Sequence, residues 1–281
     1  MSLRVPGRKY PTPVVLVNGL AEQPQSWYAN VRALARRFHV ERPDFLVYDG
    51  EPLHRRIDAG LEVTVDYLAD RLATCLGAMA RRPPYHLVAS SLGCQVAVTY
   101  AVANPEKVAR LVLLCPSGFH GDEDLPVVAG VRRSRYDALV GSVFHEGRHA
   151  DPHLIAAFEA KFRDRRWKKG VLRTLRGTVG HGVAPLLPRL AAPTLVAWGA
   201  DDRILSDVPG SIRVAARIPD VRQVVIAGCG HAPQIEKARL VNRLIAEHLT
   251  GRLKRIPPAL DPSRLLDRRD DAVARLAPLP S

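Results

Sequence analysis

Short apolar runs, bounded by turn residues, alternate along this chain with longer segments in which apolar residues recur at helical spacing. The short runs predict strands, and their alternation with helical segments is typical of a mostly parallel sheet flanked by helical crossovers. The pattern therefore indicates an α/β fold. The predicted strands are residues 14–17, residue 40 with its neighbours, and residues 85–89, 109–114, 194–198 and 223–227. The predicted helices are residues 26–37, 64–80, 92–103, 211–217 and 233–249.

The alternation breaks between about residues 119 and 188, where no strand pattern occurs. Residues 151–167 are expected to form a helix, with Asp151 as its cap and Pro152 in its first turn. Because the strand pattern resumes directly afterwards, an insertion explains the break better than a separate domain. We expect an α/β core of residues 12–118 and 189–250, an insertion of residues 119–188, and a Pro- and Arg-rich tail of residues 251–281 that packs on the surface or is partly disordered.

The composition is that of a soluble globular protein with a large core, because 47% of the 281 residues are hydrophobic and 25% are charged. It excludes a disordered, collagen-like or coiled-coil chain. The four cysteines lie far apart without a CxxC pair, which favours free thiols in a reducing compartment. The first residues hold no apolar signal segment, and no run approaches the roughly 18 apolar residues of a membrane span. A cytoplasmic location is the expectation.

The segment Ala-Ser-Ser-Leu-Gly at residues 89–93 lies between an apolar strand and an apolar helix. A tight strand-to-helix turn of this kind holds a serine hydroxyl in a strained position at the top of a sheet, beside the backbone N–H of the next residue. The nucleophile would be Ser91. Small residues are required two positions before and after it, because strand and helix nearly touch there, and Ala89 and Gly93 meet this requirement.

A serine nucleophile needs a base and an acid that orients the base, and both follow predicted strands. Gly-Ala-Asp-Asp at residues 199–202 offers Asp201 or Asp202 as the acid. Gly-Cys-Gly-His at residues 228–231 presents His231 as the base, on a sharp turn that the glycines permit. Nucleophile, acid and base then follow one another in the chain order of this triad class on a parallel sheet. Residues 122–124, which are all acidic, are a weaker alternative position for the acid.

These segments resemble the motifs of the α/β-hydrolase superfamily, as does Asn18-Gly19 after the first apolar strand, and the resemblance covers about residues 12–250. It implies an α/β-hydrolase fold with a helical cap inserted after the strand that ends near Leu114. It also implies specific roles for individual residues. The nucleophile is Ser91, the acid is Asp202, which stands three residues after the glycine, the base is His231, and the backbone N–H groups of Leu20 and Leu92 form the oxyanion hole.

Two positions depart from the family pattern, since Ala89 replaces a glycine and Asn18 replaces the usual histidine before Gly19. A serine nucleophile argues against the family's dehalogenases and epoxide hydrolases, which use aspartate. The expected function is a serine hydrolase that cleaves a carboxylic ester through an acyl-enzyme, without cofactor or metal. Thioesterase, amidase, carbon–carbon bond hydrolase and acyltransferase activities on the same triad remain alternatives, as does a non-catalytic small-molecule-binding protein.

The sequence His-Glu-Gly-Arg-His at residues 145–149 matches the letters of a zinc-protease helix, in which two histidines bind the metal. The internal glycine, the nearby Pro152 and the lack of an apolar helical flank argue against this interpretation. A polar loop in the insertion is the favoured alternative.

Residues 161–176 hold eight basic residues and one acidic residue, and so contribute seven of the chain's thirteen net positive charges. This segment could steer anionic substrates or contact anionic lipid headgroups weakly. The favoured interpretation is a cap helix that buries Ile155, Phe158 and Phe162 and solvates its charges. No recognition motif accompanies the charge, so nucleic acid is not an expected partner. A small acyl substrate is the expected partner, and the sequence leaves the oligomeric state open.

Overall fold

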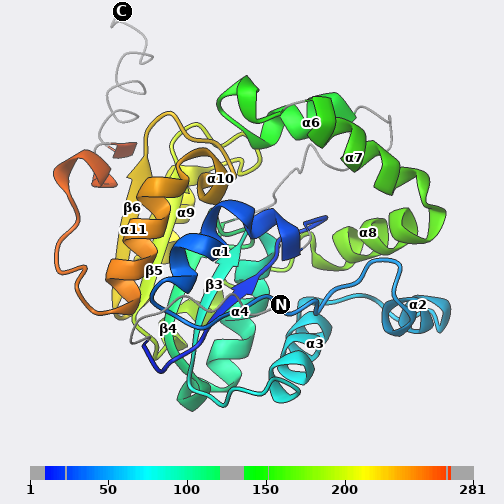
Figure 1. Cartoon of the computed structure of the whole chain (residues 1–281), viewed down its shortest axis with the longest axis horizontal. Coiled ribbons are helices and arrows are strands. Elements are labelled where there is room, and N and C mark those ends of the chain that lie inside the picture. Colours follow the sequence, from blue (N-terminus) through cyan, green and yellow to red (C-terminus); the bar gives the residue numbers. More distant parts are fainter. Residues whose placement is uncertain (1–9, 23, 121–135, 151, 264, 267–281) are drawn as a thin grey trace, which may run out of the picture.

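A computed structural model describes residues 10–22, 24–120, 136–150, 152–263 and 265–266. Within these residues, six strands form one fully parallel sheet in the order β2-β1-β3-β4-β5-β6, which confirms the predicted α/β class (Figure 1). The strands are β1 (Val14–Val17), β2 (Val40–Glu41), β3 (Tyr85–Ser90), β4 (Val108–Leu114), β5 (Thr194–Gly199) and β6 (Val221–Ile226).

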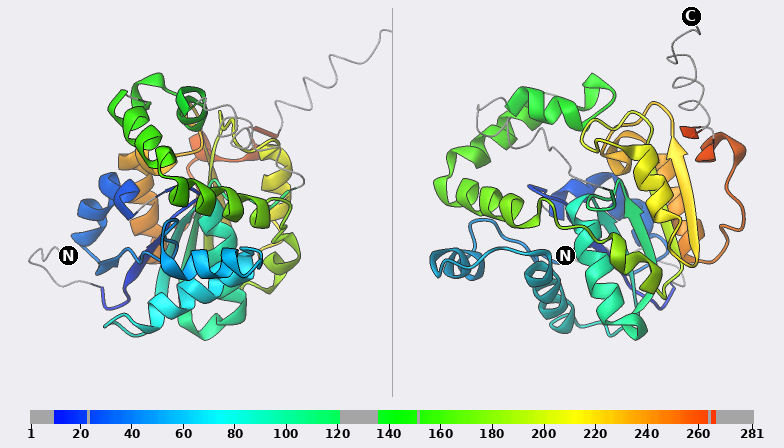
Figure 2. Two further views of the ribbon diagram at one scale, coloured as in Figure 1. Left: turned by 90° about the vertical axis from the view of Figure 1, so that its right-hand side faces the viewer. Right: turned by 180° about the vertical axis from the view of Figure 1, so that it is seen from behind.

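The strands are mostly apolar because helices cover both faces of the sheet. In β1, Val15 and Val17 join the core beneath one layer of helices, while Val14 and Leu16 join the core beneath the other. The first layer holds α3 (Val65–Gly77), α4 (Leu92–Ala103) and α9 (Val208–Ala215), and the second holds α1 (Tyr28–Ala35) and α11 (Ala238–Leu249) (Figures 1 and 2).

The order of the strands creates a crevice between β1 and β3. From β1 the chain first moves outward to β2 and then returns to β3 on the other side of β1. Ligands of such sheets bind at the carboxyl ends of the strands where the order reverses. The loops that follow β1 and β3 carry Leu20 and Ser91, so two of the predicted site residues lie at this switch point.

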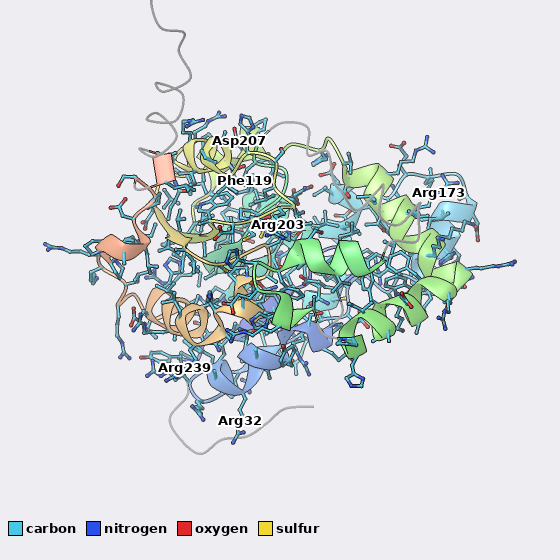
Figure 3. All side chains as sticks on the ribbon, turned by 90° about the horizontal axis from the view of Figure 1, so that it is seen from above. Arg32, Phe119, Arg173, Arg203, Asp207 and Arg239 are labelled. Atoms are coloured by element: carbon cyan, nitrogen blue, oxygen red, sulfur yellow. The ribbon has the colours of Figure 1, made fainter. Side chains whose placement is uncertain are left out.

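Between β4 and β5 the described residues form three α-helices and no strand (Figures 2 and 3). They are α6 (Tyr136–Val143), α7 (Pro152–Arg163) and α8 (Arg165–Thr178). The prediction of one helix over residues 151–167 is wrong at its end, because Asp164 breaks it. The Asp164 carboxylate accepts hydrogen bonds from the N–H groups of Arg166 and Trp167 and starts a new helix there. Asp151, the expected cap, and residues 122–124 lie outside the described residues. The cap boundaries stay a prediction.

Two further helices differ from the predictions. The sequence pattern did not predict α2 (Glu51–Asp58), and the predicted helix over residues 233–249 is divided into α10 (Pro233–Glu236) and α11 at Lys237. Lys237 has φ −122° and ψ 38°, outside the helical region. The described residues also contain short 3₁₀ helices at Pro24–Trp27, Pro105–Lys107, Gly147–His149, Ala184–Arg189 and Pro258–Leu260.

The beginning of the predicted tail packs on the core. Leu253 and Leu260 are buried against α11 and the sheet, in the same cluster as Val241 and Leu244. Of the two alternatives predicted for the tail, packing on the protein surface therefore applies to its described part.

No helix in the described ranges combines the length and apolar character that a membrane span requires.

Two buried histidines make the stability of this fold depend on pH. Burial, with a smaller contribution from Arg110, lowers the pKa of His86 and of His248 to about 4 from the ordinary value of 6.5. Each histidine is neutral in the folded state above this value, whereas the unfolded chain takes up the proton at about pH 6.5. We expect the contribution of the two histidines to the free energy of unfolding to be constant above about pH 7 and to fall between pH 6.5 and 4. The loss is on the order of 3 kcal/mol for a single histidine.

Urea unfolding at a series of pH values measures this effect, and His86→Leu is the matched variant. Because leucine carries no proton, the variant should lose stability less steeply below pH 6.5 than the wild type. Equal slopes for the two proteins would contradict the assignment to His86.

Candidate active site

Ser91 occupies a strained turn between β3 and α4. Its φ of 49° and ψ of −122° lie in a region that non-glycine residues rarely adopt. A Cβ atom on Gly93 would lie 2.5 Å from the carbonyl oxygen of Asn18 and 2.7 Å from that of Val17, so the close approach of α4 to the end of β1 requires glycine. Ala89 is fully buried. The turn has the tight packing that the sequence predicted around Ser91.

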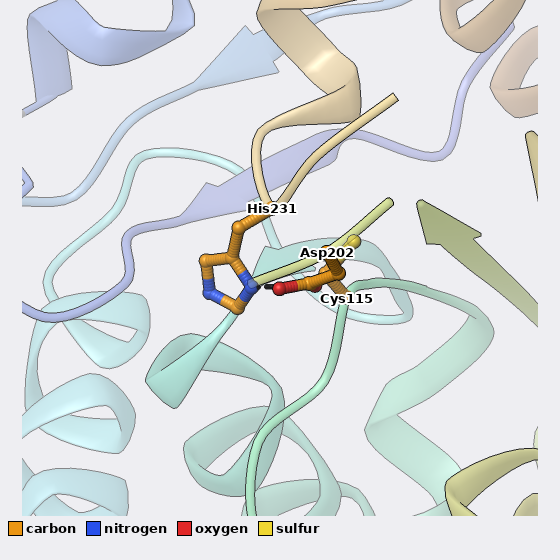
Figure 4. A group of neighbouring side chains, drawn as sticks. All are labelled: Cys115, Asp202 and His231. Atoms are coloured by element: carbon orange, nitrogen blue, oxygen red, sulfur yellow. Dashed lines mark hydrogen bonds and ion pairs between the residues drawn. The ribbon is translucent and has the colours of Figure 1, made fainter. Parts of the chain in front are cut away.

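Three predicted site residues form one chain of hydrogen bonds. Ser91 Oγ lies 2.9 Å from His231 Nε2. His231 Nδ1 lies 2.8 Å from Asp202 Oδ2, a contact that Figure 4 shows. Asp202 follows β5 and His231 follows β6, so the carboxyl ends of three parallel strands bring the side chains together. Asp201 points elsewhere, since its Oδ2 accepts a hydrogen bond from the N–H of Cys229 at 3.3 Å.

The surroundings of Asp202 keep its carboxylate charged and fixed. Burial would raise its pKa, but the nearby His231 and hydrogen bonds to the carboxylate outweigh this effect and lower the pKa below the usual range. Two of these bonds come from the N–H groups of Ile204 and Leu205, at 2.8 and 3.1 Å from Oδ1. They leave Oδ2 for the imidazole, so the acid is oriented from both sides.

Cys115, which the sequence analysis did not single out for this site, adjoins the acid. Its thiol, the Asp202 carboxylate and a His231 ring nitrogen lie within 4.8 Å of one another (Figure 4). Burial, with a further contribution from Asp202, raises the pKa of the Cys115 thiol well above its usual value. The N–H of Gly199 donates to the sulfur at 3.3 Å. The thiol is therefore a protonated neighbour of the acid.

The zinc-protease-like letters at residues 145–149 do not form the α-helix that such a motif needs. Gly147–His149 is a 3₁₀ helix, and the Glu146 carboxylate pairs with Lys237 Nζ at 2.7 Å. His145 lies 3.7 Å from Asp201, an exposed carboxylate outside the Ser91 chain. The two histidines therefore do not stand on successive turns of one helix.

The loop after β1 packs directly against Ser91. A Cβ atom on Gly19 would lie 3.0 Å from the Ser91 Cβ. Asn18, at the position of the family's histidine, accepts a hydrogen bond from Trp27 Nε1 at 2.8 Å, which anchors the start of the loop. Leu20 and Leu92, the expected oxyanion residues, line the same cavity as Ser91, and Leu92 is the first residue of α4.

Glu22 is a site residue that the sequence analysis missed. Its carboxylate accepts hydrogen bonds from the N–H of Gly19 at 2.8 Å and from Ser90 Oγ at 3.1 Å. Burial raises the pKa of Glu22 despite these bonds. The Tyr48 hydroxyl accepts a bond from the N–H of Ala21 at 2.9 Å. The signal for Glu22 was its charge, since it is the one charged residue in the sequence between Val17 and Tyr28. Tyr48 comes from a distant segment.

A largely apolar cavity of about 210 Å³ leads away from Ser91 and His231. Its polar wall includes Gln95, whose Nε2 donates to Ser117 Oγ at 2.8 Å and whose buried Oε1 has no partner among the described residues. The inserted helices and the start of the following segment supply most of the apolar wall. These residues are Val140, Val143, Phe144, Phe158, Phe162, Val171, Leu175 and Val179.

Glu236 connects the loop that carries His231 to the insertion through hydrogen bonds. Its carboxylate accepts hydrogen bonds from the N–H of Gly230 at 2.7 Å, of His145 at 2.8 Å and of Glu146 at 3.1 Å. The N–H of His231 itself donates to a carbonyl in the insertion, that of Val143, at 2.8 Å. The position of the imidazole therefore depends on contacts between two distant segments.

Replacing Glu236 with leucine should lower both stability and activity. Three N–H groups would lose their acceptor, at a cost of about 1–3 kcal/mol for each group that stays buried. Displacement of the His231 loop should lower kcat on the order of 100-fold. Urea unfolding and ester hydrolysis measure the two effects. Glu236→Gln keeps one acceptor oxygen and should fall between the wild type and Glu236→Leu; equal behaviour of the three proteins would contradict this role.

Residues 14–244 match the model of the alpha/beta hydrolase family. This match covers most of the chain, so the chain belongs to the α/β-hydrolase family, as the motifs predicted. Among curated relatives, human monoacylglycerol lipase ABHD6 is 24% identical over 265 residues, which cover 88% of this chain and 77% of that protein. The 2-hydroxy-6-oxononadienedioate/2-hydroxy-6-oxononatrienedioate hydrolase of Paraburkholderia xenovorans is 29% identical over 178 residues, 58% of this chain and 61% of that protein.

Solved structures support the same conclusion. A bacterial membrane phospholipase A, described as a virulence factor, has a TM-score of 0.70 and 25% identity, and the match covers 91% of this chain and 86% of that one. A serine hydrolase involved in carbazole degradation has a TM-score of 0.72 at 21% identity, over 87% of this chain and 93% of that one, which shows the shared fold. The protein is an enzyme of the α/β-hydrolase family.

Proposed function

We propose that the protein is a serine hydrolase that cleaves a carboxylic ester through an acyl-enzyme on Ser91. The observation that carries this proposal is the hydrogen-bonded chain from Ser91 Oγ through His231 to Asp202, with distances of 2.9 and 2.8 Å. A serine hydroxyl is a weak nucleophile unless an adjacent base takes its proton. This arrangement supplies the base and the carboxylate that orients it.

In the proposed mechanism, His231 Nε2 takes the proton of Ser91 as Oγ attacks the carbonyl carbon of the ester. Asp202 holds the imidazole in the required tautomer and stabilises its positive charge. The backbone N–H groups of Leu20 and Leu92 would donate to the oxyanion, each contributing on the order of 3 kcal/mol. His231 then gives its proton to the leaving alkoxide. In the second half, His231 takes a proton from water as the water attacks the acyl carbon, and then gives that proton to Ser91 Oγ as the bond to the acyl group breaks and the acid is released.

The cavity favours an ester with an apolar acyl chain. Helices α6, α7 and α8 act as a cap in this proposal and supply the wall along which the chain would lie. No Lys or Arg occurs among the described residues of the lining, which includes the carboxylate of Glu22. A dicarboxylate such as that in the name of the Paraburkholderia relative would find no counter-ion there. An ester is therefore preferred to a carbon–carbon bond substrate of that class.

The test is hydrolysis of p-nitrophenyl esters from acetate to palmitate, together with labelling by a fluorophosphonate. We expect turnover that depends on chain length and one covalent label on the peptide that contains Ser91. A chelator should leave the rate unchanged, because the proposed steps use no metal. Labelling of a different residue, or a lack of turnover with all esters, would overturn the proposal and direct the search to thioesters, amides and carbon–carbon bonds.

A further inference from the structure

The outer surface of the inserted helices is strongly basic. In α8, one stripe of residues is buried against the core, including Trp167, Val171 and Leu175, and the opposite stripe carries positive charge. Lys161, in the last turn of α7, is a further exposed basic residue of the insertion. We call the exposed residues Lys161, Arg165, Arg173 and Arg176 the basic face.

Neighbouring acids neutralise other basic residues of this segment but not the basic face. Arg166 pairs with Glu51 of α2 at 2.8 Å, and Lys169 pairs with Asp58 of α2 at 2.7 Å. Within the described ranges, no ion pair joins a residue of the basic face to an acid. Helix α2 thus pairs with Arg166 and Lys169 but leaves the four residues of the basic face in solvent.

Apolar side chains are exposed beside the end of the basic face. Val179, directly after α8, is 42% exposed and also lines the cavity that leads to Ser91. Leu61 is 55% exposed. A Cβ atom on Gly177 would lie 2.4 Å from the carbonyl oxygen of Val63, which places the segment after Leu61 against the last turn of α8. We call Leu61 and Val179 the apolar rim. Val179, which both lines the cavity and is exposed, lies where the cavity wall reaches the surface.

We propose that the basic face and the apolar rim dock on a lipid bilayer that contains anionic lipids. Clustered Lys and Arg bind anionic headgroups, and adjacent exposed aliphatic side chains enter the boundary between headgroups and acyl chains. Docking in this orientation would place Val179 at the bilayer, so that an acyl chain passes from lipid into the cavity. This inference rests on the proposed hydrolase function for its substrate, which would be a lipid ester, but the docking itself does not require catalysis.

The test measures partition of the full chain onto vesicles by sedimentation. Ser91→Ala serves as the background, so that the lipid is not consumed. The vesicles contain phosphatidylcholine alone or with 30% phosphatidylserine. The basic-face variant carries Arg165→Gln, Arg173→Gln and Arg176→Gln. A control of equal net charge carries Arg32→Gln, Arg217→Gln and Arg239→Gln, which are also exposed; Figure 3 shows Arg173 far from Arg32 and Arg239.

We expect phosphatidylserine to raise the partition of the background protein at least 100-fold, and 0.5 M salt to reverse this increase. The partition of the basic-face variant onto these vesicles should be lower on the order of 100-fold, since each charge near the membrane surface contributes about fivefold to partition. The control should stay within about threefold of the background. Equal losses in the two variants would show attraction by net charge alone and overturn the proposal, as would equal binding to both kinds of vesicle.

The apolar rim is tested by Leu61→Ser with Val179→Ser, which should weaken partition about tenfold without changing net charge. In the Ser91 wild type, the basic-face variant should hydrolyse p-nitrophenyl butyrate at the normal rate. Failure of that hydrolysis in every protein would contradict the proposed function while leaving the partition result valid. Normal hydrolysis with unchanged partition would contradict only the docking.

Discussion

Ser91→Ala is expected to lower kcat for ester hydrolysis on the order of 10⁶-fold, to the level of residual catalysis by binding and the oxyanion donors. The variant removes only the Oγ that lies 2.9 Å from His231 Nε2. The turn itself should persist, because the N–H of Ser91 still donates to the carbonyl of Leu114 and alanine has no greater bulk. Rates with p-nitrophenyl butyrate and thermal unfolding of the same samples measure both quantities.

Ser90→Ala is the matched control for this prediction. Ser90 precedes the nucleophile and bonds to Glu22 and Gln234, so its loss loosens the surroundings without removing a reacting atom. We expect a reduction of about tenfold or less. Activity above 1% of wild type in Ser91→Ala, or equal losses in the two variants, would contradict the role of Ser91.

The fold was largely predictable because its strands are buried on both faces and therefore appear as uninterrupted apolar runs. Residues 14–17 are the clearest case, since all four side chains are aliphatic and fully buried between the helices on the two sides of the sheet. Helix α3 begins where the pattern predicted, because Thr64 caps it by accepting a bond from the N–H of Tyr67, but it ends at Gly77 and not at residue 80.

Elements that depend on distant partners could not be predicted in this way. Helix α2 is polar, and its acids are paired with α8 more than one hundred residues later in the chain. The division of the helix at Lys237 places Glu236 against the N–H groups of Gly230 and His145, which belong to other segments. Hydrophobic periodicity along one segment indicates which of its faces is buried. It does not indicate which distant residue will pair with a carboxylate on that segment.

The same distinction between local and distant signals applies to the residues of the candidate site. The turn of Ser91 and the glycine-bounded His231 are local patterns, so the sequence identified them directly. The choice between Asp201 and Asp202 was not local, because adjacent carboxylates at a strand end have the same composition, and only the family resemblance selected one. Glu22 and Cys115 approach the site from two further strand ends and had no motif of their own.

Asp202→Asn is expected to lower kcat on the order of 10⁴-fold near neutral pH. The Asp202 side chain is fully buried and its Oδ1 accepts two backbone N–H bonds, which hold the other oxygen 2.8 Å from His231 Nδ1. With Oδ1 retained by the backbone donors, the amide NH₂ of asparagine would face Nδ1 and favour the tautomer with its proton on Nε2. That tautomer cannot accept the proton of Ser91.

Asp201→Asn separates this effect from a general loss of acidic charge at the strand end. The Asp201 side chain is 41% exposed and accepts a bond from the N–H of Cys229, which asparagine can also accept. We expect kcat within about threefold of wild type. The pKa of Asp202 is lowered, so protonation of Asp202 should not set the acidic limb of the pH–rate profile in wild type or in Asp201→Asn. A larger loss in Asp201→Asn than in Asp202→Asn would transfer the role of the acid to Asp201 and break the proposed chain from Ser91.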